Sequence, residues 1–308
     1  MRPILDMDTV QIEVTNYCHN SCSNCTRFCG HFMKPYFMNK ADVEKAIDSM
    51  VGYPKMTGIM GGEPLFHPHF EQICKYLQSK IPKNQCGLWT CLPKGKEHYR
   101  ESIVETFGHI FINDHTRDDI LHHPCLVAAE EMPFEGWKKD YLISKCWAQE
   151  AWSASINPKG AWFCEIAASL AMLLDVQNLG WPVEQGWWAR SPQHFIQQMA
   201  MCHYCGCAMP LKRRVSTEDI DDISPKMYEV LKDVSPKLIK GKYKIHDLQP
   251  FTGKEGQCAT YKDPRYREKI ARRYGMFLVQ NEQCFVSPYL IKNWTKPERT
   301  ETDENQTE

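Results

Sequence analysis

The sequence predicts an α/β fold: a mostly parallel sheet in the first half, open or closed into a partial (β/α) barrel, and then a small α+β region. Short segments in which hydrophobic and polar residues alternate are typical of strands, and between them hydrophobic residues recur at helical spacing. Repeated β-α units with right-handed crossovers place their strands in parallel. After about residue 140 this pattern gives way to a hairpin and shorter elements, which predicts the second region.

The elements of the first half follow in order. Val10, Ile12 and Val14 alternate with polar residues in a strand that runs directly into Cys18. Asn39 can cap a helix that starts just after it, because its side chain is a preferred acceptor for the first free amides of a helix. Further strands are predicted at residues 57–60, 87–90 and 109–112, with helices near 70–77 and 97–107 between them.

The second half is predicted to contain a β-hairpin, a helix that leads to Cys202, two later helices and a tail. The tail lacks hydrophobic side chains and is expected to be disordered. In order, the predicted positions are 153–164 for the hairpin, 191–202, 225–233 and 264–274 for the helices, and 297–308 for the tail.

The charges of the chain are balanced, with 37 Lys and Arg residues against 38 Asp and Glu residues among 308. The nearly neutral net charge does not attract a nucleic acid or a membrane surface, so we expect neither as a partner. The longest nearly continuous apolar stretch, residues 166–174, is far too short to cross a bilayer. The first residues contain no hydrophobic secretory segment, so we expect a cytoplasmic protein.

Cysteine is the unusual feature of the composition, with 15 residues. Disulfides rarely persist in the reducing compartment expected here, so metal binding, redox chemistry or burial must explain these thiols. Two groups are dense, with four cysteines within twelve residues and three within six. The isolated cysteines, interpreted as ordinary buried thiols, include Cys74, Cys86, Cys91, Cys125, Cys258 and Cys284.

The first dense group contains a C-x3-C-x2-C triplet, formed by Cys18, Cys22 and Cys25 in a loop after a predicted strand. Three thiolates on one short loop can bind three irons of a [4Fe–4S] cluster and leave the fourth iron open to a ligand. Cys29 is an alternative fourth ligand, which would make the site a closed cluster or a zinc site. The triplet alone leaves these alternatives open.

A second motif, Gly61-Gly62-Glu63-Pro64, follows the next predicted strand. Its two glycines allow a ligand to approach the backbone closely, Glu63 offers an acceptor for an ammonium group, and Pro64 stiffens the exit. A tight turn without a ligand is the alternative. Parallel strands place their carboxyl ends at one edge of a sheet, so we expect this motif and the triplet to face one site.

In combination, the triplet and the 61–64 motif resemble the radical SAM superfamily, which implies a partial barrel over residues 8–140. The residues that carry the resemblance are Cys18, Cys22 and Cys25 for the catalytic [4Fe–4S] cluster and Gly61, Gly62, Glu63 and Pro64 for S-adenosylmethionine. The resemblance implies that one electron from the cluster cleaves the sulfonium to methionine and a 5′-deoxyadenosyl radical, which abstracts hydrogen from a substrate. One departure is Asn24, at a position where many members have an aromatic residue.

The second half carries another group of cysteines. Cys146 and Cys164 bracket the predicted hairpin, and Cys202 and Cys205 follow the next helix. Four thiolates in this arrangement can bind a second [4Fe–4S] cluster in which every iron is coordinated. The alternatives are a structural zinc on the same residues, or plain buried thiols at Cys146 and Cys164. Cys207 is extra and is an alternative to Cys205 as a ligand.

The order of these four cysteines resembles the twitch domain, the short form of the SPASM auxiliary-cluster domain, which occurs in the radical SAM dehydrogenase of aminoglycoside biosynthesis. The resemblance implies an auxiliary-cluster domain over residues 141–212 and leaves 213–296 as a C-terminal extension. A fully coordinated cluster cannot bind substrate, so its expected role is to accept an electron. This role favours a two-electron oxidation.

The sequence therefore predicts an oxidoreductase-type radical SAM enzyme with two [4Fe–4S] clusters. We expect it to act on a small molecule or a peptide and to receive electrons from a donor such as flavodoxin or ferredoxin. One alternative is a peptide-modifying enzyme of ribosomal peptide maturation. The other, of a different class, is a non-enzymatic zinc protein in which both cysteine groups are structural.

Overall fold

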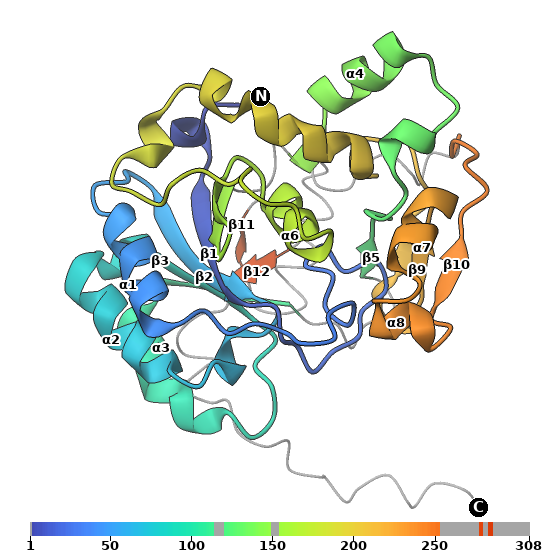
Figure 1. Ribbon diagram of the computed structural model, residues 1–308. Coiled ribbons are helices and arrows are strands. Elements are labelled where there is room, and N and C mark those ends of the chain that lie inside the picture. Colours follow the sequence, from blue (N-terminus) through green and yellow to red (C-terminus); the bar gives the residue numbers. More distant parts are fainter. Residues whose placement is uncertain (1, 114–119, 149–153, 253–276, 280–282, 286–308) are drawn as a thin grey trace, which may run out of the picture.

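The computed structural model describes residues 2–113, 120–148, 154–252, 277–279 and 283–285, the last two segments by their backbone only (Figure 1). Its centre is an α/β arrangement around one large sheet, which confirms the predicted class. In spatial order the described strands of this sheet are β11 (Phe277–Val279), β12 (Gln283–Phe285), β4 (His109–Ile112), β3 (Cys86–Thr90), β2 (Met56–Gly61), β1 (Thr9–Thr15), β6 (Ala154–Asn157) and β7 (Gly160–Trp162).

The five central strands, β4, β3, β2, β1 and β6, run parallel to one another. Val10 of β1 lies opposite Thr57 on one side and Ala154 on the other. The hairpin of β6 and β7 is antiparallel and extends the sheet beyond β1. The hairpin predicted for the second region therefore belongs to the same sheet as the first predicted strand, and the division into regions at residue 140 stays a prediction.

Three helices of the first half lie together on one side of the sheet, whereas α6 (Glu165–Leu173) lies on the other side (Figure 1). The three are α1 (Lys40–Ser49), α2 (Phe70–Lys80) and α3 (Arg100–Thr106). The predicted cap is confirmed, because the Asn39 side chain accepts a hydrogen bond from the amide of Asp42 at 2.9 Å. Apolar side chains on each of these helices are buried, as their spacing predicts.

Strand β1 is buried on both faces, all seven residues of it, although its alternation of hydrophobic and polar residues is typical of a half-exposed strand. Its polar residues Gln11 and Glu13 face other polar groups in the interior: Gln11 accepts from Arg27, and Glu13 accepts from Ser169. Burial of a polar group is tolerated when it is hydrogen-bonded in this way. The second face of β1 therefore forms part of a polar interior.

The second half contains shorter elements. The predicted helix before Cys202 is a 3-10 helix, η7 (Pro192–Tyr204), and the predicted helix at 225–233 is α7 (Pro225–Leu231). The predicted helix at 264–274 and the tail 297–308 lie outside the described residues. The remaining elements are α4 (Gly136–Ser144), α8 (Pro236–Ile239), and two small sheets, one of β5 (Leu121–His122) with β8 (Arg214–Val215) and one of β9 (Asp221–Ile223) with β10 (Tyr243–Ile245).

Helix α6 coincides with the apolar stretch that the sequence analysis considered only as a membrane span. Residues 165–171 of this helix are buried, so it is a core helix. Across the described part of the chain, none of the helices has both the length and the apolar character that a membrane crossing needs.

Candidate functional site

The triplet loop and the 61–64 motif lie side by side where β1 and β2 end. The amide of Gly62 donates to the carbonyl of Thr15 at 2.8 Å, and the amide of Glu63 donates to the carbonyl of Tyr17 at 2.7 Å. Tyr17 immediately precedes Cys18, so these two backbone bonds fix the first cysteine beside the glycine motif. The expectation that both motifs face one edge of the sheet agrees with this geometry.

The two glycines are required by the neighbouring chain. A Cβ atom on Gly61 would lie 2.1 Å from the carbonyl oxygen of Thr15, and one on Gly62 would lie 2.2 Å from that of Tyr17. Both distances are far below van der Waals contact, so any larger residue would push the two segments apart. The sequence pattern predicted that a ligand approaches these glycines, whereas the observed close approach is that of the cysteine loop.

Glu63 is buried, and its carboxylate is fully engaged within the chain. One oxygen accepts from Thr90 Oγ1 at 2.7 Å and from the amide of Leu65 at 3.1 Å. The other accepts from the amide and the thiol of Cys91, at 2.8 and 2.9 Å. Burial raises the pKa of this carboxyl, and the hydrogen bonds from Cys91 oppose that shift. Glu63 therefore ties the end of β3 to the motif, a role that the sequence analysis did not foresee.

The cysteines of the first group are close enough to perturb one another. Cys22 and Cys29 are buried, while Cys18 and Cys25 keep part of their surface exposed. A hydrogen bond from the Cys29 thiol is the main cause that lowers the pKa of Cys25 to about 5. The Cys29 thiol also interacts with Cys18. Burial raises the pKa of Cys22, and the neighbouring Cys25 and Cys18 raise it further, so this thiol needs a cation or a metal to stay ionised.

The donor set of the triplet loop consists of three thiols. In the segments that the structure describes, no three His, Cys, Asp or Glu side chains are placed to bind a single metal ion. A [4Fe–4S] cluster instead takes its thiolate ligands at separate corners, and a short loop such as this one supplies them. The donor set of Cys18, Cys22 and Cys25 is therefore compatible with the predicted cluster. Cys29 remains the alternative fourth ligand.

Asn24 connects the triplet loop to β9. Its backbone φ is 49°, in the left-handed region that Asn tolerates better than most residues. Its side-chain amide donates to Asp222 at 3.0 Å and its side-chain oxygen accepts from the amide of Asp222 at 2.8 Å. The loop between Cys22 and Cys25 is thus held by residues almost 200 positions later in the chain.

Arg27 links the two cysteine groups through the polar interior. Its guanidinium is buried, and one nitrogen lies 2.7 Å from Glu165 and 2.8 Å from Gln11. Glu13 is 3.7 Å from Arg27 Nε. The Nε and Nη1 atoms of Arg27 have no hydrogen-bond partner among the described residues. Burial raises the pKa of Glu13 to about 7; Arg27 opposes this shift and Glu165 adds to it.

The second group of cysteines lines one cavity. The thiol-bearing residues in its wall are Cys146, Cys164, Cys202, Cys205 and Cys207. The rest of the wall is mainly apolar, with side chains such as Phe163, Ile166 and Met199. The four predicted ligands therefore face a common space, and Cys207 shares it with them. Thiolates around one such space can coordinate every iron of an iron–sulfur cluster.

Cys125 is a residue of this region that the sequence analysis missed. Its Sγ lies 3.4 Å from Cys207 Sγ, across 82 positions of sequence, and its carbonyl accepts from the amide of Gly206 at 3.0 Å. Cys125 is buried, as expected, but it contacts the second group of cysteines. Hydrogen bonds from Cys125 and Cys207 hold the pKa of Cys205 well below its usual value. No signal in the local sequence around Cys125 indicates this contact.

Comparisons with known proteins assign no family to the chain. No family model matches the chain, and no curated protein matches it. Among solved structures, the chain is similar to one described as BtrN in complex with AdoMet and 2-DOIA. The two are 12% identical, the TM-score is 0.42, and the match covers 64% of this chain and 88% of the other. The likeness is distant.

Proposed function

We propose that this protein is a radical SAM enzyme that oxidises its substrate by two electrons. The observation that carries the proposal is the pairing of Gly62 and Glu63 with the backbone around Tyr17, which fixes a three-cysteine loop against a glycine motif at the ends of two parallel strands. Ligand sites of parallel α/β sheets lie at this edge. A site with three thiolates can bind a [4Fe–4S] cluster through Cys18, Cys22 and Cys25 and leave one iron open.

When bound, the cluster and S-adenosylmethionine supply a one-electron cleavage that yields methionine and a 5′-deoxyadenosyl radical able to abstract hydrogen from a substrate. The protein contributes position and exclusion of water. Glu63 holds Thr90 and Cys91 at the end of β3 through three hydrogen bonds and accepts a fourth from the amide of Leu65, so its carboxylate acts by positioning the strand ends. An ammonium group would then be recognised by other polar groups at this edge.

The cavity of the second cysteine group supports the oxidative part of the proposal. Cys146, Cys164, Cys202 and Cys205 can hold an auxiliary cluster there, which would take the second electron from the substrate. The Arg27–Glu165 pair joins the segment after Cys25 to the residue after Cys164, so the two groups belong to one connected interior. We further propose a small-molecule substrate and an electron donor such as flavodoxin or ferredoxin.

Iron content and cofactor cleavage test this proposal. After anaerobic reconstitution, the full-length protein is expected to bind about eight irons and to cleave S-adenosylmethionine to 5′-deoxyadenosine under strong reductant. Cys22→Ala should abolish the cleavage and lose about half of the iron. Cys205→Ala should lose iron of the second group and keep at least part of the cleavage.

Cys74→Ala is the matched control, because Cys74 is a buried thiol of α2 that lies in neither group. It should retain both the iron and the cleavage. Normal cleavage by Cys22→Ala would overturn the assignment of the catalytic loop. A colourless wild-type protein with about two zinc ions would favour the zinc protein instead.

A further inference from the structure

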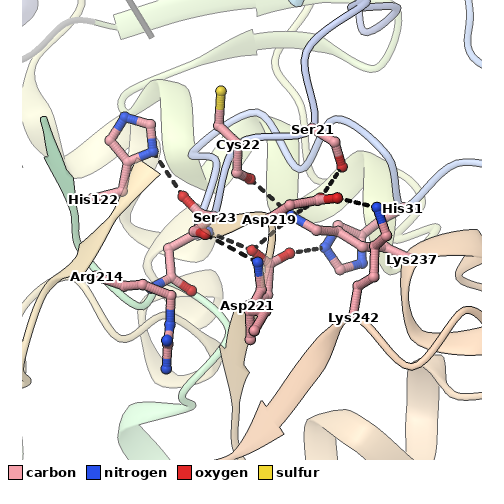
Figure 2. A network of polar contacts seen from close by, with 12 residues as sticks. Ser21, Cys22, Ser23, His31, His122, Arg214, Asp219, Asp221, Lys237 and Lys242 are labelled. Atoms are coloured by element: carbon pink, nitrogen blue, oxygen red, sulfur yellow. Dashed lines mark hydrogen bonds and ion pairs between the residues drawn. The ribbon is translucent and has the colours of Figure 1, made fainter. Parts of the chain in front are cut away.

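The segment from β8 to β10 packs against the triplet loop (Figure 2). The amide of Ser23 donates to the carbonyl of Ser216 at 2.8 Å, and the amide of Ile220 donates to Ser23 Oγ at 3.0 Å. The amide of Asn24 donates to the carboxylate of Asp221. The cysteine loop is therefore bound on one side by a part of the chain to which the sequence analysis gave no function.

Lys237, at the start of α8, is the centre of this contact. It is only 2% exposed, and its ammonium donates to the carbonyl of Cys22 at 2.8 Å and to Asp221 Oδ1 at 3.0 Å. Its ammonium also lies 3.8 Å from Asp219 Oδ1. A buried ammonium is costly unless it is paired and hydrogen-bonded, and the contacts of Lys237 meet that condition. One of its partners is the backbone of the middle cysteine of the triplet.

Asp221 is the second buried charged residue of this contact. It is 1% exposed and accepts from Lys237, from the amide of Asn24 and from the imidazole of His31. His31 is fixed in turn by a hydrogen bond of 2.8 Å between its Nδ1 and the hydroxyl of Ser235. Asp221 therefore holds the triplet loop at two points, before Cys25 and after Cys29. Figure 2 shows Asp221 of β9 and Lys237 of α8 beside the loop that carries Cys22 and His31.

We propose that Lys237 and Asp221 are positioning residues of the catalytic cluster, which fix the triplet loop and set the charge around it. This inference rests on the proposed function. Charges in a buried site act with little screening. A cation near a cluster stabilises the reduced form, which carries one more electron, whereas an anion destabilises it. Lys237 therefore raises the reduction potential of the cluster, and Asp221 lowers it.

The test compares Lys237→Met, Asp221→Asn and the double variant in the anaerobically reconstituted full-length protein. The readout is the midpoint potential of the cluster whose EPR spectrum changes when S-adenosylmethionine is added. Lys237→Met should shift this potential to more negative values and Asp221→Asn to more positive values. The double variant removes one positive and one negative charge, so its potential should return toward that of the wild type.

Lys242→Met is the matched control. Its ammonium pairs with Asp219 in the same network, but its side chain is 43% exposed, so solvent screens its charge and the potential should not move. Shifts of equal sign in the two single variants would overturn the proposal, because they indicate a loosened loop without a charge effect. Unchanged potentials in both would also overturn it.

If a single variant does not fold, the double variant decides. A potential near that of the wild type together with faster amide exchange in residues 18–31 supports the proposal, and unchanged exchange overturns it. Failure of the proposed function gives a separate result, because the wild-type protein would then have no cluster that responds to S-adenosylmethionine.

Discussion

Arg27 and Glu165 form a buried ion pair with a separation of 2.7 Å, and this pair joins the two cysteine segments. Arg27 lies two residues after Cys25, and Glu165 directly follows Cys164. Glu13 lies 3.7 Å from Nε of the same guanidinium, so one cation is close to two carboxyl groups in the interior. Such an arrangement depends on all of its members, because removal of one leaves an uncompensated charge without access to water.

Replacement of either partner should therefore destabilise the protein strongly. We expect Arg27→Met and Glu165→Gln each to lower the free energy of unfolding by about 3–5 kcal/mol, measured by urea denaturation under anaerobic conditions. Lys40→Met is the control, since Lys40 pairs with Glu44 on the surface of α1. Its cost should be at most about 1 kcal/mol. Comparable losses of unfolding free energy in all three variants would show that the interior pair stabilises the protein no more than a surface pair does.

Glu13 should make the stability depend on pH in a specific window. Its pKa is raised from 4.5 to about 7 in the folded protein, chiefly by burial. Between these values the folded state keeps a proton that the unfolded chain has released, so stability falls as pH rises. The contribution is fully present below pH 4.5 and lost above about 7, and it amounts to roughly 3 kcal/mol.

Glu13→Gln removes this titration. The slope of the unfolding free energy against pH should therefore become less negative between pH 5 and 7, by up to about 1.4 kcal/mol per pH unit. Glu71→Gln, which changes an exposed carboxylate on α2, should leave the slope as it is. Equal slopes in the wild type and in Glu13→Gln would contradict the raised pKa.

Local sequence patterns were sufficient to predict the strands and the helix cap that position the site. Strands β1, β2, β3 and β4 and the cap at Asn39 were predicted because periodicity and capping act over a few residues. The adjacency of the triplet and the glycine motif also followed from local information, since consecutive parallel strands end at the same edge of a sheet.

The residues that hold the site were missed because their partners are distant in sequence. Arg27, Lys237 and Asp221 are ordinary charged residues in the sequence, and only the fold shows that each is buried against the cysteine loop or its surroundings. Helix α6 was missed for a different reason. It is apolar on nearly all sides, so it carries no amphipathic period.

The close contact of the two chain segments predicts that the glycines cannot be replaced. Gly61→Ala and Gly62→Ala would place a Cβ atom 2.1 and 2.2 Å from backbone oxygens, so we expect a loss of about 1–3 kcal/mol in stability. Binding of S-adenosylmethionine, measured by calorimetry, should be lost as the segments separate. Gly136→Ala is the control, because its Cβ would meet no atom within 4 Å. It should bind normally and be as stable as the wild type or slightly more so. Normal binding by Gly62→Ala would show that the ligand does not depend on this contact.

Cys125 should influence the auxiliary cluster without binding it. It is not among the residues that line the cavity, so Cys125→Ala should retain the iron of the second group, whereas Cys205→Ala should lose it. Its thiol donates to Cys205, and hydrogen bonds to a ligand sulfur stabilise the reduced cluster. The midpoint potential of this cluster should therefore become more negative in Cys125→Ala.

Cys125→Ser separates the hydrogen bond from the sulfur itself. A serine hydroxyl can still donate to Cys205 but is a poor ligand for iron, so this variant should recover most of the potential shift and keep all of its iron. Loss of iron in both Cys125 variants would instead make Cys125 a ligand. Cys205 would then share its corner of the cavity with a thiol that comes from 80 residues earlier in the chain.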